Sequence, residues 1–194
     1  MKLSVIFSSG TGHNLTIAKW VEDEAKKHDV EVRVRKVAEL ALPAELNPGQ
    51  QKYQEDSKDI PEATPEDFVW ADAVIFSTPA RYGIMTAAMK NYLESLVGAW
   101  SEGTTIDKVV SAFATAQNRN GGQEMTVRSI YTSMMHHGAI IVPPGYTNEV
   151  QFAIGGNPYG VSGTATREGF ESDIEEAVRH QARRTIEIAK KIHG

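Results

Sequence analysis

Apolar residues fall into short continuous runs that alternate with longer segments in which they recur every three or four positions. The short runs predict five strands, at residues 2–7, 30–37, 73–77, 108–114 and 139–142. The longer segments predict helices at 14–27, 86–97, 123–137 and 168–193. Strands separated by helices form βαβ units, so the sequence predicts an α/β fold: a doubly wound, five-stranded parallel sheet with helices on both faces.

Several local patterns refine this prediction. Apolar and polar residues alternate strictly over 30–37, which favours an edge position in the sheet. The run Thr64-Pro65-Glu66-Asp67 is typical of a helix start, with Thr64 as the N-cap and Pro65 in the first turn. Residues 38–63 and 143–165 show weak periodicity, so we expect two long connections, the first without a firm helix.

The first helix carries an apolar stripe formed by Leu15, Ala18, Val21 and Ala25, which we expect in the core. Ile17 and Trp20 lie on a neighbouring stripe. We expect these two side chains to form an association patch, and the alternative is that Trp20 completes the core of its own chain.

The turn between the first strand and the first helix is the strongest chemical signal. It reads Ser8-Ser9-Gly10-Thr11-Gly12 and ends at a helix N-terminus, where backbone N–H groups lack intrahelical partners. Such groups bind phosphate. Gly10 and Gly12 allow the backbone to approach a ligand closely, and the hydroxyls of Ser9, Thr11 and Thr16 can add donors.

The spacing of this turn excludes two nucleotide motifs. A P-loop needs Lys-Ser or Lys-Thr after its last glycine, and a dinucleotide fingerprint needs a third glycine where Leu15 stands. A cradle for a single phosphomonoester remains, and the alternative is a plain glycine turn without a ligand.

Two further loops follow the third and fourth predicted strands, at 78–85 and 115–122. Parallel strands end at one edge of the sheet, where ligands bind, so these loops converge on the phosphate cradle. The first offers Arg81 and Tyr82, and the second offers hydroxyl, amide and glycine backbone groups. A flat heteroaromatic phosphomonoester suits this combination, and FMN is the candidate.

Composition narrows the function. The 194 residues fit one domain, residues 1–194, and the net charge of −5 gives no basic footprint for nucleic acid. Cysteine is absent, which excludes disulfides and thiol catalysis. No secretory leader or membrane-spanning apolar run is evident, so we expect a cytoplasmic protein.

Six motifs in order resemble the WrbA family of flavodoxin-like NAD(P)H:quinone oxidoreductases. They lie at residues 9–16, 78–83, 98–100, 121–124, 136–145 and 155–160. The resemblance implies a flavodoxin-like fold with strand order 2-1-3-4-5, one FMN per subunit and a homotetramer. It also implies two-electron, ping-pong hydride transfer from NAD(P)H through FMN to a quinone.

The resemblance also assigns residues by position. His136 would reach the flavin and, with Arg81, stabilise charge, while Trp100 would wall the substrate cavity from a neighbouring subunit. Two adjacent histidines diverge on a helix, so we expect no metal at His136 and His137. The phosphate would be held by Ser9, Gly10, Thr11, Gly12, His13 and Asn14. The ribityl chain and the ring would contact Ala80, Arg81, Tyr82, Thr115, Ala116, Gln117, Asn118, Gly121 and Gly122.

Two other functions remain open on the sequence: a flavodoxin-type electron carrier, and a non-enzymatic flavin-binding or partner-binding module. The chain departs from the family at Thr11, where an aromatic residue is frequent, and at 117–120, where a Thr/Gly-rich run is usual.

Overall fold

A parallel sheet of the expected order forms the centre of the molecule. The computed structural model describes residues 1–40 and 44–194. Its five principal strands follow the order β2-β1-β3-β4-β5, and a sixth strand pairs with β4. The strands are β1 (Lys2–Phe7), β2 (Glu31–Lys36), β3 (Ala73–Pro79), β4 (Val109–Ala116), β5 (Ile140–Ile141) and β6 (Ser162–Thr164). The predicted strand order and the edge position of β2 are both confirmed.

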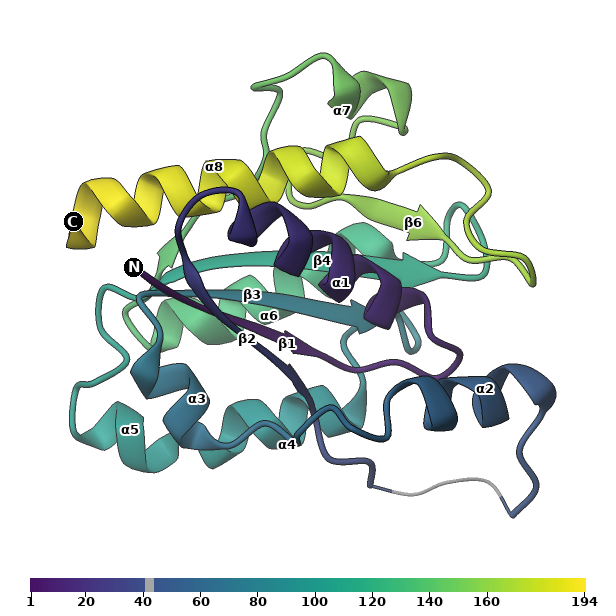
Figure 1. Ribbon diagram of the computed structural model, residues 1–194, viewed down its shortest axis with the longest axis horizontal. Helices are drawn as coiled ribbons and strands as arrows, with labels where there is room; N and C mark the ends of the chain where they lie inside the picture. The colour runs from purple at the N-terminus through teal and green to yellow at the C-terminus, as the bar shows by residue number, and fades with distance from the viewer. Residues whose placement is uncertain (41–43) are drawn as a thin grey trace.

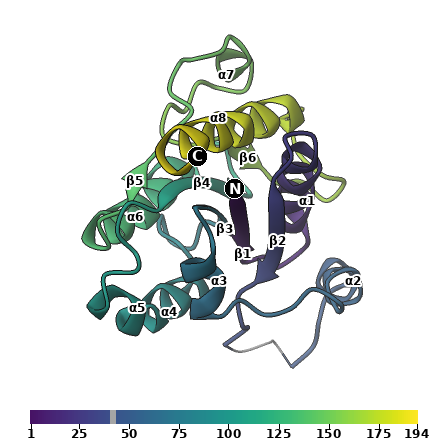
Figure 2. The ribbon, with the colours of Figure 1, turned by 60° about the vertical axis from the view of Figure 1, so that its left-hand side comes forward.

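Helices cover both faces of the sheet (Figures 1 and 2). They are α1 (His13–Lys26), α2 (Pro48–Asp56), α3 (Pro65–Trp70), α4 (Ala87–Ser95), α5 (Val97–Ser101), α6 (Gln123–His136), α7 (Val150–Ala153) and α8 (Glu175–His193). One apolar cluster packs α1 and α8 against the sheet, and a second packs α3, α4 and α6 against the other face. In the described ranges, no helix has the length and apolar character needed to cross a membrane.

The prediction that residues 38–63 contain no firm helix is wrong. Helix α2 lies within this connection, and Pro48 occupies its first turn. The side chain of Asn47 accepts a hydrogen bond from the Gln50 backbone, and the side chain of Gln50 accepts one from the Asn47 backbone. This capping box is a local sequence signal that periodicity alone does not detect, because the helix buries only Tyr53.

The connection at 143–165 is also more structured than expected. It contains α7 and ends in β6, which pairs in parallel with Ala114–Ala116 of β4 beyond the short strand β5. Gln181 of α8 joins β4 to the start of β6. Its amide donates to the Ser111 hydroxyl and the Ala112 carbonyl and accepts from the Val161 backbone N–H. Helix α8 begins at Glu175, seven residues later than predicted.

The prediction that Ile17 and Trp20 of α1 form an association patch is wrong. Ile17 is completely buried in the core with Leu15, Ala18, Val21 and Ala25. Trp20 is partly buried, and its ring lies 5.8 Å from the ring of Phe170. Phe170, in the segment that follows β6, therefore packs against Trp20, for which the sequence offered no partner within the chain. The N-cap at Thr64, in contrast, is confirmed.

Candidate functional site

The turn after β1 presents a set of unpaired backbone donors. Gly12, the N-cap of α1, has a φ of 93°, a left-handed conformation that favours glycine. Within the described part of the chain, the N–H groups of residues 10, 11, 13, 14 and 15 have no hydrogen-bond acceptor. These groups cluster at the positive end of α1 and can bind one phosphate.

Side chains brace this turn from within. The Ser9 hydroxyl accepts a hydrogen bond from the Gly12 N–H at 3.0 Å. The Thr16 hydroxyl donates to the Gly12 carbonyl at 3.3 Å. The hydroxyls of Ser9 and Thr16 therefore hold the shape of the turn while the free backbone N–H groups remain for a ligand.

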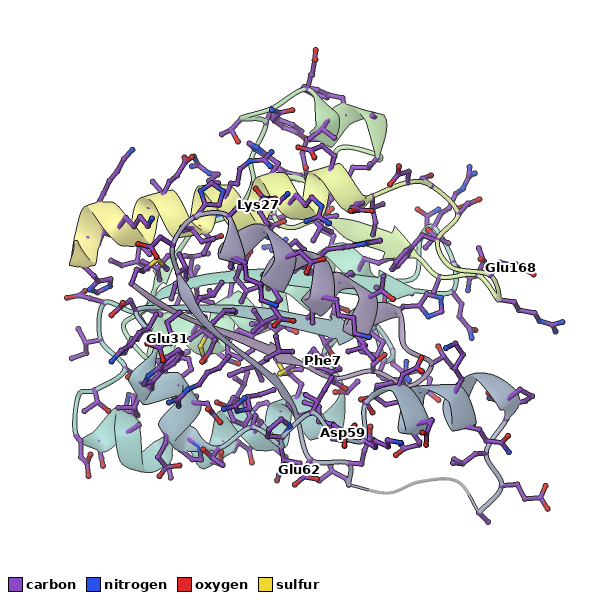
Figure 3. All side chains as sticks on the ribbon, viewed as in Figure 1. Phe7, Lys27, Glu31, Asp59, Glu62 and Glu168 are labelled. Carbon is purple, nitrogen blue, oxygen red and sulfur yellow. The ribbon has the colours of Figure 1, made fainter. Side chains whose placement is uncertain are left out.

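The His13 side chain holds another segment against the turn. Its Nε2 lies 3.0 Å from the carbonyl oxygen of Thr166 and 2.9 Å from that of Gly169. Its Nδ1 lies 3.1 Å from the Thr11 hydroxyl. His13 thus ties the segment after β6 to the first turn of α1. Glu168 lies at the tip of this segment, at the carboxyl end of the sheet (Figure 3).

Asn14 is the second residue of α1, and its side chain is directed into the protein. Only 1% of Asn14 is exposed. Its amide nitrogen donates to the Thr115 hydroxyl at 2.9 Å, and its amide oxygen accepts from the Ser77 hydroxyl at 2.8 Å. The Asn14 side chain thus connects the cradle to β3 and β4.

The loop after β3 forms a tight hairpin beside the cradle. The backbones of Arg81 and Ile84 exchange hydrogen bonds, and the two residues between them, Tyr82 and Gly83, both have positive φ. Tyr82 is fully exposed at the tip, and a tyrosine in this conformation is uncommon. The Arg81 guanidinium lies next to Gly10, where an added Cβ would stand 3.4 Å from it. Cradle and hairpin therefore form one continuous surface.

The loop after β4 completes the group of three. Thr115 and Ala116 end β4, and residues 117–120 are exposed. Asn118 accepts hydrogen bonds through its carbonyl from the Gly121 N–H and the Gln123 amide. Arg119 makes a bidentate ion pair with Glu171, with its closest contact at 2.7 Å. The loop is thus tied to the same segment that His13 holds.

A cavity of about 780 Å³ opens between the cradle and the loop after β4. Its lining combines residues of the cradle and of the β4 loop with two regions that sequence reasoning left out, the start of α2 and the segment after β6. Those lining residues are Thr11, His13, Asn47, Pro48, Gly49, Gln117, Ala165, Thr166 and Arg167. The capping box at Asn47 could have revealed the first region, whereas no local pattern marks the second.

Two predicted site residues lie at the opposite end of the sheet. Helix α6 begins beside the β4 loop and ends at His136, so its 14 residues separate His136 from that loop by about 20 Å. Trp100 lies with His136: its indole N–H donates to the His136 carbonyl at 3.1 Å. Trp100 is 54% exposed. Within one chain, the structure does not bring His136 and Trp100 together with the cradle.

A second, smaller cavity of about 320 Å³ lies at this opposite end. Leu93, Val97, Trp100, His136 and His137 contribute to its lining. Burial, and next the charge of neighbouring His136, lower the pKa of His137, which favours its neutral form at neutral pH. The cavity thus offers an indole and imidazoles to a ligand or to another protein surface.

Comparisons with known proteins agree with this geometry. The family model described as NADPH-dependent FMN reductase matches residues 1–153, and the chain belongs to this family. An NAD(P)H dehydrogenase (quinone) from Deinococcus radiodurans is 42% identical over 197 residues, covering 100% of this chain and 98% of that protein. A second NAD(P)H dehydrogenase (quinone), from Brucella ovis, is 35% identical over 202 residues, covering 100% of this chain and 100% of that protein.

Solved structures show the same fold at low identity. The flavodoxin, WrbA-like protein from Agrobacterium tumefaciens superimposes with a TM-score of 0.63 at 19% identity, covering 98% of both chains. A flavodoxin from the domain Archaea gives a TM-score of 0.61 at 15% identity over the full length of both chains. The flavodoxin-like fold expected from the sequence is therefore confirmed.

Proposed function

We propose that this member of the NADPH-dependent FMN reductase family is an FMN-dependent NAD(P)H:quinone oxidoreductase of the WrbA type. The relatives at 42% and 35% identity are NAD(P)H dehydrogenases (quinone), and each matches this chain from end to end. The observation that carries the proposal is the set of free N–H groups at the start of α1, beside two further loops at the same sheet edge.

The chemistry of the cradle fits the phosphate of FMN. Five backbone donors and a helix N-terminus suit a dianionic phosphomonoester. The side chains of Ser9 and Thr16 support the turn, and Arg81 places a positive charge beside Gly10. The flavin ring and ribityl chain would lie along Ala80, Arg81, Tyr82 and the 115–122 loop.

The bound FMN would accept a hydride from NAD(P)H and deliver two electrons to a quinone. The contributions of the chain are binding, orientation and electrostatics. Tyr82, fully exposed on its rigid hairpin, would stack against a planar substrate, and Arg81 would stabilise negative charge near the ring. One aromatic slot would serve both substrates, so the nicotinamide leaves before the quinone enters.

The location of His136 and Trp100 supports a site completed by a second copy. They lie together at the end of the sheet away from the cradle, and the exposed side chain of Val97 lines the same cavity. An exposed apolar group of this kind suits a subunit contact. In a homotetramer, Trp100 and His136 of one subunit would cover the flavin of its neighbour. We further propose that the chain is a single FMN-binding domain that works in the cytoplasm.

Flavin binding and steady-state kinetics test the function. The purified protein should bind FMN far more tightly than riboflavin, and anaerobic NADH or NADPH should bleach the flavin without a stable semiquinone. With NADH and benzoquinone, double-reciprocal plots should give parallel lines. A stable blue semiquinone would favour the electron carrier. Failure to oxidise NAD(P)H would favour a non-enzymatic flavin-binding module. Intersecting lines would contradict a single slot that binds the nicotinamide and the quinone in turn.

A further inference from the structure

We propose that Asn14 is a positioning residue, whose side chain sets the places of the three flavin-binding loops relative to one another. This inference rests on the proposed function, because it concerns the same site. It revises the sequence-based assignment of Asn14 as a phosphate ligand: its backbone N–H faces the cradle, while its side chain acts elsewhere.

The hydrogen bonds of Asn14 reach both strands that lead into the other two loops. Its amide nitrogen donates to Thr115 in β4, and its amide oxygen accepts from Ser77 in β3. Ser77 lies three residues before Ala80, and Thr115 begins the predicted 115–122 contact region. A single side chain at the cradle thus fixes the starting points of the other two loops.

The backbone extends the same connection. The Thr115 carbonyl accepts a hydrogen bond from the Ala80 N–H at 2.7 Å, so Thr115 joins the loop after β3 as well as Asn14. The chain of contacts runs from the cradle through Asn14 and Thr115 to Ala80. All three side-chain partners, Asn14, Ser77 and Thr115, are at most 2% exposed.

The pairing and burial of the Asn14 side chain argue against a direct phosphate contact. One N–H of its amide nitrogen donates to Thr115, its amide oxygen accepts from Ser77, and only 1% of the residue is exposed. A buried hydroxyl that loses its partner is costly, so the loops would shift to repair the loss. Flavin binding depends on all three loops at once, and small displacements at such sites reduce function strongly.

Two substitutions separate positioning from phosphate binding. Asn14→Leu keeps a similar volume and removes both hydrogen bonds; we expect FMN and riboflavin affinity to fall together, each by about tenfold or more. Asn14→Asp keeps an acceptor for the Ser77 and Thr115 hydroxyls but adds negative charge at the cradle. We expect it to bind riboflavin nearly as the wild type does and to bind FMN more weakly.

The matched control is Gln181→Leu, which removes another buried amide that joins a helix to β4. It should lower the melting temperature of the flavin-free protein while leaving the absorption spectrum of bound FMN unchanged. Asn14→Leu should change that spectrum, because the loops around the ring move.

The outcomes are distinct for the two proposals. A wild-type protein that binds neither flavin would overturn the proposed function and the role of Asn14 together. If the wild type binds FMN, loss of FMN affinity alone in Asn14→Leu would make Asn14 a phosphate ligand and overturn its positioning role. Unchanged flavin affinities with a lowered melting temperature would leave Asn14 a purely structural residue.

Discussion

Gly83 and Gly122 meet backbone to backbone: a Cβ built on Gly122 would stand 2.6 Å from the Cα of Gly83. Gly83 belongs to the hairpin that presents Tyr82, and Gly122 is the N-cap of α6. The loops after β3 and β4 can therefore touch this closely because Gly122 has no side chain, whereas the Cβ position of Gly83 meets nothing within 4 Å. This contact sets how close Tyr82 lies to the 115–122 loop.

Replacing Gly122 with alanine should displace the hairpin. The new Cβ would collide with backbone, and the residue would also have to adopt a φ of 85°. We expect both FMN and riboflavin binding to weaken by about 1–3 kcal/mol, measured by quenching of flavin fluorescence. Gly155→Ala is the control, because Gly155 has a φ of 102° with nothing within 4 Å of its Cβ position. Equal behaviour of the two variants would argue against the contact.

Gly12→Val tests the phosphate cradle itself. Nothing in the protein lies within 4 Å of the Cβ position of Gly12, so the cost comes from its φ of 93° and from crowding of a bound phosphate. We expect FMN affinity to fall by about 2 kcal/mol and riboflavin affinity to change much less. Calorimetric titration of both flavins measures this difference, with Gly155→Val as the control for backbone strain. Equal losses for the two flavins would place the phosphate elsewhere.

Trp100→Glu tests whether a neighbouring subunit completes the active site. A charge on this exposed indole position should disrupt a contact that includes Val97. Light scattering should show wild-type protein at about four chain masses and the variant at a lower mass, with quinone reduction reduced by about tenfold or more. Ile192→Glu, at an exposed position near the end of α8, should change neither quantity. A wild-type monomer with full activity would refute an active site built from two subunits.

Glu24 makes folding stability dependent on acid pH. Burial alone would raise the pKa of its carboxyl, but hydrogen bonds from Lys27, Arg183 and His28 outweigh burial and lower the pKa to about 2. Because this pKa lies below the unfolded value of 4.5, the stabilisation is complete above that pH and is lost as the pH falls towards 2.

Denaturant unfolding of wild type and Glu24→Gln from pH 7 to 3 measures this contribution. We expect the wild-type free energy of unfolding to decrease below pH 4.5, by an amount on the order of 3 kcal/mol if the titration were carried to completion. Glu24→Gln should lose stability at pH 7 and show a shallower decrease. Glu22→Gln, at a half-exposed pair with Lys26, is the control. Parallel pH profiles for wild type and Glu24→Gln would contradict this role.

Elements whose signals are local can be predicted from the sequence. The strand, turn and helix at the cradle follow from a buried run, two glycines and an apolar stripe within the first 25 residues. The same is true of the N-cap at Thr64 and of the edge position of β2, whose residues are all at least partly exposed. The three loops could be assigned to one edge because parallel strands all end there.

The orientation of side chains toward or away from a ligand depends on long-range contacts. Asn14 finds its partners 63 and 101 residues away, at Ser77 and Thr115, and only the pairing of β1, β3 and β4 brings them together. The ring of Phe170, in the segment after β6, packs against Trp20. The apolar stripe of α1 could not reveal whether Trp20 contacts its own chain or a partner subunit. His136 lies far from the cradle because the fixed rise of α6 carries it there, and Trp100 of α5 lies beside it through its hydrogen bond to the His136 carbonyl. Periodicity along a chain reports which positions are buried, whereas the partner of each buried or exposed group depends on strand order and helix length.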